Sequence, residues 1–283
     1  MDTQHLLERQ SFIELDARSR ARKLLDEGTF SELLDPFQRI KSPWLARQGI
    51  VTQADDGTVV AKGTIDGQPA VVLAIDGGFQ GGSMGEVSAA KIAGSLELAA
   101  EDNRNGIPTR AVILFETGGV RLQEANLGLA AIAEIQAAIV DLRRYQPVIG
   151  ITAGTIGCYG GMSIAAGLCS YLIATREARL GLNGPAVIEQ EAGIAEFDSR
   201  DRPMIWSFTG CEQRYRTGLT DVLADDDADA IRTAVIECFR AGRPEACRSE
   251  RVAGFLARIA EIDPRLQATP EQVAAIYGKG FES

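Results

Sequence analysis

Two glycine-rich turns, each placed between a short apolar run and a predicted helix, constrain the fold of this chain most. The first turn follows the apolar run 111–115 and contains Gly118 and Gly119. The second follows the run 148–152 and ends at Gly160 and Gly161. Backbone N–H groups at two helix starts can converge on one oxygen atom and stabilise negative charge that develops there. The two turns therefore predict an oxyanion hole built from backbone.

Apolar runs and helical periods alternate along most of the chain, which predicts an α/β fold. We expect a helical N-terminal extension over residues 1–48 and one domain over 49–283. The expected strands are 50–53, 58–65, 69–76, 110–115, 147–152, 170–174 and 179–181, with a hairpin turn at 55–57. The expected helices are a basic helix from residue 11 toward Gly28, then 86–105, 123–144, 161–169 and 228–241, the last capped by the acidic run 225–227. Residues 183–191 are expected to form a polar loop.

Composition excludes several classes of function. The formal net charge of −10 disfavours binding to nucleic acid or to an acidic membrane surface. The five cysteines form no CxxC pair, which argues against a zinc ribbon and a disulfide framework. The uncharged stretch 147–175 contains six glycines, so we expect a strand, a turn and a buried helix there and no membrane span.

Histidine is nearly absent. The only histidine is His5, so a Ser-His-Asp triad or a three-histidine metal site is excluded within this chain, and no metal is expected. The N-terminal residues show no signal-peptide pattern, which predicts a cytoplasmic location.

Four motifs, in order along the chain, resemble the carboxyltransferase branch of the crotonase superfamily. Residues 81–85 read GGSMG, as in acetyl-CoA carboxylase β-type subunits. The other three are 118–124, similar to GGARMQE, 160–163, similar to GGVS, and 184–190, similar to GPRVIEQ. The resemblance covers roughly residues 70–225.

Two segments, 117–126 and 156–163, look more like the β subunits of malonate decarboxylases than like the carboxylases. The four-cysteine zinc ribbon of bacterial carboxylase β subunits is missing, and Ala186 stands where those proteins carry Arg. The resemblance implies a crotonase-like (ClpP/crotonase) ββα superhelix, a single carboxyltransferase-type domain with helical N- and C-terminal extensions. It also implies that this chain is one half of a two-part site, completed by a homologous γ subunit.

The same resemblance implies a substrate and candidate site residues. The substrate would be a malonyl thioester on an acyl-carrier protein, whose CoA-derived prosthetic group belongs to that partner, with no cofactor bound in this chain. The candidate catalytic residues, acting through their backbone, are Gly118, Gly119, Val120, Gly160 and Gly161. The candidate substrate-binding residues are Gly81, Gly82, Ser83, Met84, Arg121, Tyr159 and Met162.

Plainer interpretations stay open for each candidate. The glycines can serve only tight turns, and 81–85 can be a simple connection. Arg121 can form an ordinary ion pair with Glu124, three residues on. Glu189 and Gln190 can help to deliver a proton or bind substrate, but a surface or subunit-contact role is favoured.

Four functions are compatible with these motifs to different degrees. Decarboxylation of the malonyl thioester to acetyl thioester and CO₂ is favoured, and transfer of the carboxyl group to biotin is the main alternative. A hydratase or isomerase is disfavoured, because those enzymes usually carry an acidic residue where this chain has Met162 and Ser163. A non-catalytic half that serves as a scaffold is the fourth.

Overall fold

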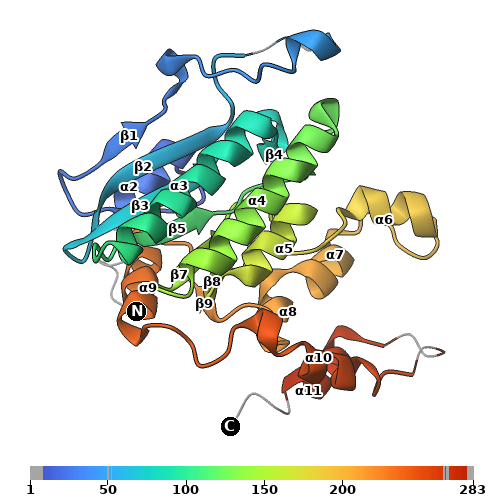
Figure 1. Cartoon of the computed structure of the whole chain (residues 1–283). Helices are drawn as coiled ribbons and strands as arrows, with labels where there is room; N and C mark the ends of the chain where they lie inside the picture. Colours follow the sequence, from blue (N-terminus) through green and yellow to red (C-terminus); the bar gives the residue numbers. More distant parts are fainter. Residues whose placement is uncertain (1–8, 50, 52, 264, 266–267, 279–283) are drawn as a thin grey trace.

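A seven-stranded sheet forms the centre of the computed structural model, which describes residues 9–49, 51, 53–263, 265 and 268–278 (Figure 1). Its spatial order is β1-β2-β3-β5-β7-β8-β9. The strands are β1 Ser31–Leu33, β2 Thr58–Ile65, β3 Gln68–Ile75, β5 Arg110–Leu114, β7 Val148–Thr152, β8 Tyr171–Thr175 and β9 Val222–Ala224. The pairs β1–β2 and β2–β3 are antiparallel, and every pair from β3 to β9 is parallel.

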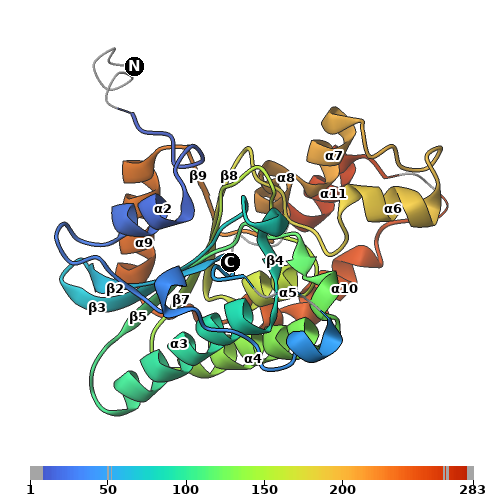
Figure 2. The same ribbon diagram turned by 90° about the horizontal axis from the view of Figure 1, so that it is seen from above.

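Helices cover both faces of the sheet (Figure 2). On one face lie α3 Glu86–Arg104, α4 Asn126–Leu142 and α5 Gly161–Leu168, and on the other α2 Ala17–Leu24 and α9 Ala228–Ala241. Alternate side chains of one strand enter different cores, as Leu73 packs with the α3 and α4 side and Val72 with the α2 and α9 side. Coverage of both faces explains why the parallel strands read as continuous apolar runs.

A second, smaller layer stands at the carboxyl ends of the parallel strands. Here β4 Ser83–Met84 pairs in parallel with β6 Gly119–Val120. Single bridges connect Thr117 to Cys158 and Cys158 to Leu180. The segments that follow β3, β5, β7 and β8 are thereby aligned side by side, and the expected strand 179–181 is one of these bridging segments.

Among the described residues, five further α-helices follow β8: α6 Pro185–Ala192, α7 Arg202–Thr209, α8 Cys211–Arg216, α10 Val252–Ile259 and α11 Pro270–Gly278. The prediction of a polar loop over 183–191 is wrong, because α6 occupies most of it. Pro185 is the first residue of this helix, where its fixed φ and missing N–H are tolerated, and Gly193 ends it with φ 91°. Figure 1 shows α6 at the margin of the molecule, away from the sheet.

The N-terminal predictions need three corrections. The basic helix begins at Ala17, where Asp16 accepts a hydrogen bond from the Ser19 N–H (2.7 Å), and it ends at Leu24, before Gly28. The short strand β1 was not predicted. The turn at 55–57 does not join two strands, since β2 pairs with β1 and β3 and the hairpin turn between β2 and β3 is Asp66–Gly67, with φ 52° and 72°.

Part of the expected strand 50–53 lies outside the described residues, because 50 and 52 are not described, and residues 51 and 53 are not in a strand. The boundary between residues 48 and 49 stays a prediction. In the structure, β1 extends the central sheet and α2 contributes Ala21 and Leu24 to one of its two cores.

The acidic run before α9 holds the N-terminal segment rather than capping the helix with a side chain. Asp227 occupies the N-cap position, but its carboxylate accepts from the Gln10 N–H (3.3 Å), and no side-chain capping bond is present. The neighbouring Asp226 carboxylate accepts from the Ile13 N–H (2.9 Å). These bonds connect the N-terminal segment to the loop between β9 and α9.

Candidate active site

The two predicted glycine turns meet in the structure. A Cβ added to Gly160 would lie 3.2 Å from the Gly119 Cα, and a Cβ added to Gly119 would lie 3.4 Å from the Gly160 Cα. Both residues have positive φ, 106° at Gly119 and 63° at Gly160, a conformation that side chains disfavour. Glycine at both positions therefore permits the backbones after β5 and β7 to touch.

Three of the five predicted backbone donors are already used inside the chain. The acceptors are the Gly81 carbonyl for the Gly118 N–H (2.9 Å), the Thr117 Oγ1 for the Gly119 N–H (3.0 Å) and the Leu182 carbonyl for the Gly160 N–H (2.8 Å). These bonds fix the turns, so these three amides are not open to a ligand in this conformation.

The other two donors, Val120 and Gly161, are differently placed. The Arg121 N–H donates to the Met84 carbonyl (2.8 Å), and because successive amides of a strand point to opposite sides, the Val120 N–H points away from β4. Gly161 is the first residue of α5, and no acceptor for its N–H is found among the described residues. The first amides of a helix have no partner within the helix.

The GGSMG segment lies against the first turn. Gly82 has φ 66°, and a Cβ there would overlap the Glu116 carbonyl, so this glycine allows a close backbone approach. Ser83 pairs with Gly119 through β4 and β6. The Met84 side chain is fully buried in the core and does not reach the pocket described below.

Tyr159 and Met162 also lie inside the protein rather than in that pocket. Met162 is fully buried in the same core as Met84. The Tyr159 ring packs beside Gly157 and Gly181, and the Arg179 guanidinium lies 5.8 Å from its centroid. Burial raises the pKa of the Tyr159 hydroxyl, which keeps it protonated at neutral pH. A substrate contact from either side chain stays a prediction.

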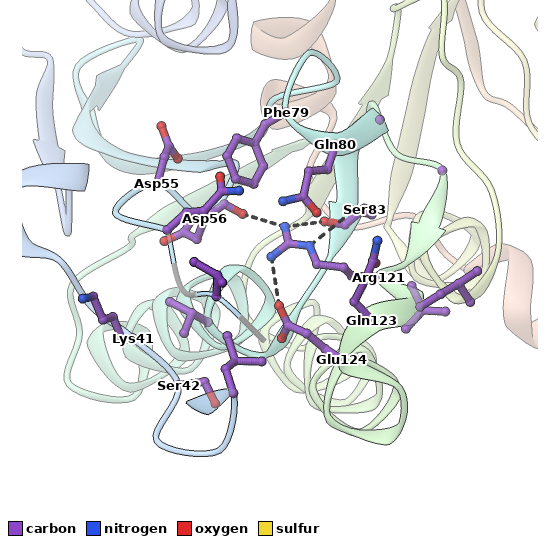
Figure 3. Close-up of a pocket in the computed structure, with 18 of the residues that line it drawn as sticks. Lys41, Ser42, Asp55, Asp56, Phe79, Gln80, Ser83, Arg121, Gln123 and Glu124 are labelled. Carbon is purple, nitrogen blue, oxygen red and sulfur yellow. Dashed lines mark hydrogen bonds and ion pairs between the residues drawn. The ribbon is translucent and has the colours of Figure 1, made fainter. Parts of the chain in front are cut away.

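A pocket of about 640 Å³ opens beside the GGSMG segment and the first turn (Figure 3). One wall is built from Gly81, Ser83, Gly118, Val120 and Arg121. The opposite wall comes from the segment before β2 and includes Lys41, Ser42, Asp55 and Asp56. The structure therefore brings five of the predicted site residues to one cavity.

Arg121 is held by protein groups at the centre of this pocket (Figure 3). Its guanidinium forms an ion pair with Glu124 (3.0 Å) and donates to the carbonyls of Ser83 (2.9 Å) and Asp56 (3.0 Å). The Glu124 carboxylate also accepts from the Glu86 N–H (2.7 Å) at the start of α3, where the helix dipole favours negative charge. The ion-pair interpretation describes this geometry, and a contact from Arg121 to substrate stays a prediction.

Sequence reasoning missed the buried ion pair between Lys91 and Asp56. The Lys91 Nζ lies 2.9 Å from the Asp56 carboxylate and donates to the Thr58 carbonyl (2.7 Å). Burial raises the pKa of Asp56, and Lys91 opposes that rise. The sequence did contain a signal for this ion pair, because Lys91 lies between Ala89 and Ile92 on the apolar face of a helix.

A second missed ion pair, between Arg20 of α2 and Glu116, lies directly before the first turn. The Arg20 guanidinium also donates to the carbonyls of Phe12 (2.9 Å) and Ile13 (2.7 Å). The Glu116 side chain fills the space that glycine leaves at position 154, where a Cβ would overlap its carboxylate. The pair connects the N-terminal helix to the residue that precedes Thr117.

Glu189 takes part in a local contact on α6. Its carboxylate accepts from the Ser199 N–H (2.7 Å), and hydrogen bonds with Ser199 lower the pKa of Glu189. This contact closes the loop after α6, and the surface or subunit-contact role favoured for Glu189 stays a prediction.

Two negative findings apply to the described ranges only. No three or more His, Cys, Asp or Glu side chains there are grouped so that they could hold a metal ion. In the same part of the chain, no helix has the length and hydropathy needed to cross a membrane.

Comparison with known proteins identifies a family and relatives that agree with the motifs. Residues 14–241 match the family described as carboxyl transferase domain. The malonyl-S-ACP:biotin-protein carboxyltransferase MADC of Malonomonas rubra is 41% identical over 244 residues, which cover 82% of this chain and 77% of that protein. The motif resemblance to the carboxyltransferase branch is thereby confirmed.

Solved structures agree with this result. A chain of a Pseudomonas malonate decarboxylase hetero-tetramer in complex with malonate is 66% identical, with a TM-score of 0.93 over 98% of this chain and 100% of that one. A chain of the transcarboxylase 12S hexamer is 29% identical, with a TM-score of 0.65 over 83% of this chain and 42% of that one. The predicted crotonase-like α/β fold is confirmed.

Proposed function

Because the chain belongs to the carboxyl transferase domain family, we propose that it is the β subunit of a malonate decarboxylase. It decarboxylates a malonyl thioester on an acyl-carrier protein and leaves the acetyl thioester and CO₂. The similarity to a malonate decarboxylase chain over its whole length supports this assignment.

The chemistry requires stabilisation of an enolate. Loss of CO₂ leaves negative charge on the thioester oxygen, and donors aimed at that oxygen lower the barrier. In the proposal, the Val120 and Gly161 N–H groups are these donors, and Gly118, Gly119 and Gly160 shape the turns that present them. The observation that carries the proposal is the contact between Gly119 and Gly160, which brings the two turns together.

The pocket beside Arg121 suits the acyl arm of the carrier. It adjoins Val120, and its size of about 640 Å³ is that of ordinary ligand pockets. The CoA-derived prosthetic group would belong to the carrier, and this chain would bind no cofactor of its own. The proton donor would be water or a residue of the homologous γ subunit. That subunit would complete the site, and the complex would be located in the cytoplasm.

Transfer of the carboxyl group to biotin is the second candidate. It is favoured by the 41% identity to a relative described as a biotin-protein carboxyltransferase. The two reactions share the enolate and differ in the fate of the carboxyl group. A scaffold without chemistry is the third possibility, and the experiment below separates all three.

The test is the pair of variants Gly161→Pro and Gly161→Ala in the complex with the γ subunit. Proline is tolerated at the first position of a helix and removes the N–H, whereas alanine keeps the N–H and makes the same Cβ contact with Ile132. We expect CO₂ release from malonyl-carrier protein to be about 10²–10³-fold slower for Gly161→Pro than for Gly161→Ala.

The assay is run with assembly verified by size-exclusion chromatography. Equal turnover of the two variants would contradict the assignment of the Gly161 N–H as a donor and would favour a non-catalytic scaffold. Excess avidin separates the two reactions: release that persists supports decarboxylation, and release that avidin abolishes supports transfer to biotin.

A further inference from the structure

A second pocket, of about 410 Å³, lies where α5, α8 and α10 meet. Its walls are mostly apolar and include Ile164, Leu168, Leu182, Leu219 and Phe255. It is separate from the pocket beside Arg121, with which it shares no lining residue.

One charged side chain in this pocket, Arg214 of α8, lacks a carboxylate. Its Nε donates to the Leu180 carbonyl (2.8 Å), and within the described chain no carboxylate lies at ion-pair distance from it. Burial lowers the pKa of Arg214, which reports the loss of hydration around the guanidinium. Arg248, which lines the same pocket, pairs with Asp221.

A partly desolvated guanidinium without an anion is costly, because the lost hydration is not replaced. The planar fork of arginine offers parallel N–H donors that match a carboxylate. The pocket therefore presents a cationic group among apolar walls, and the ligand that fits has a carboxylate and an apolar flank.

The surroundings favour a protein as the source of that carboxylate. Ile164 is 50% exposed and Leu182 is 59% exposed, so the apolar wall continues to the surface. Apolar residues around a partly buried arginine are typical of the centre of a protein interface. The wall also adjoins the candidate site, since the Leu182 carbonyl accepts the Gly160 N–H and Ile164 lies one turn after Gly161.

We propose that this pocket, centred on Arg214, receives an aspartate or glutamate side chain with an apolar neighbour from the homologous partner subunit. This inference rests on the proposed function, in which such a partner completes the site. A partner anchored here would lie next to α5 and could contribute groups to the substrate side of Gly161.

The test compares Arg214→Met with Arg216→Met in the full chain. Arg216 is on the same helix but is exposed and pairs with Glu212, so it controls for loss of charge on α8. We expect Arg214→Met to weaken the affinity for the partner at least ~30-fold, as at an interface hot spot, and Arg216→Met to leave it unchanged. We also expect Arg214→Met not to lower the melting temperature of the isolated chain, because removal of a desolvated charge offsets the loss of the hydrogen bond to the Leu180 carbonyl.

Three results would overturn the inference. One is equal partner affinity of the two variants. Another is a loss of melting temperature that accompanies the loss of affinity, which would make Arg214 structural. The third is Arg214-dependent binding of free malonate by the isolated chain with unchanged partner affinity, which would make the ligand a small carboxylate.

Turnover at saturating partner concentration separates this inference from the proposed function. If the complex with Arg214→Met reaches the wild-type rate of CO₂ release at saturating partner concentration, both the partner contact at Arg214 and the proposed function are supported. If the wild-type complex forms through Arg214 but releases no CO₂, the proposed function is contradicted and the partner contact at Arg214 is supported.

Discussion

The ion pair between Arg20 and Glu116 gives the sharpest stability prediction. The side chains are only 8% and 11% exposed, and the Arg20 guanidinium is also bonded to two backbone carbonyls. Arg20→Met leaves the Glu116 carboxylate buried beside Gly154 without its counter-ion. Breaking a buried pair in this way costs about 3–5 kcal/mol.

The matched control is Arg18→Met on the same helix. Arg18 pairs with Glu32 but is 37% exposed, so its loss costs about 0–1 kcal/mol. With roughly 2–4 °C per kcal/mol for a domain of this size, Arg20→Met should melt roughly 6–20 °C below the wild type. Arg18→Met should melt within about 4 °C of the wild type.

The assay is thermal and urea unfolding of both variants and of the double variant Arg20→Met/Glu116→Gln. The double variant should regain part of the lost stability, because it buries no unpaired charge. Equal stability of Arg20→Met and Arg18→Met would refute a strong buried ion pair, as would a double variant no more stable than Arg20→Met.

Two further predictions concern titrating groups. Burial raises the pKa of Asp26, but hydrogen bonds from Thr64, Gly67 and Asp66 and the charge of Arg232 outweigh it, so the folded pKa lies below the ordinary value of 3.8. A carboxyl group whose pKa is lower in the folded state stabilises the fold above its unfolded pKa, and this stability is lost as pH falls through the folded pKa. The urea midpoint of Asp26→Asn should therefore lie below that of the wild type near neutral pH, and the difference should shrink below pH 4. A difference that does not change with pH would contradict this. Burial also raises the pKa of Cys169 and Cys211 to about 12, which leaves about one thiolate in 10⁴ at pH 8. Iodoacetamide should therefore label them only in denaturant, and native labelling measured by mass spectrometry would show the burial to be wrong.

Local signals predicted much of the fold. The strands at 69–76, 110–115 and 147–152 were found because strands covered on both faces are apolar along most of their length. The meeting of the two turns was also predicted, because glycine turns at the ends of neighbouring parallel strands lie at one edge.

The missed features depend on contacts between distant residues. Thr117 Oγ1 and the Leu182 carbonyl decide which backbone amides remain free to bind a ligand. No pattern in the sequence assigns those two acceptors. The Arg20–Glu116 pair joins residues 96 positions apart. The strand β1 has three residues and no periodicity to detect.

The strand order also bears on how the chain is made. From β1 to β9, each strand of the central sheet pairs with the strand of that sheet synthesised just before it. The sheet can therefore grow from one edge while the ribosome is still adding residues, and no strand must be inserted between two that are already paired. Contacts of the N-terminal region form later: that of Asp226 and Asp227 with residues 10–13 forms only after four-fifths of the chain has emerged. Until then, residues 10–13 lack these two carboxylates and are held by the Arg20 guanidinium, which donates to the Phe12 and Ile13 carbonyls.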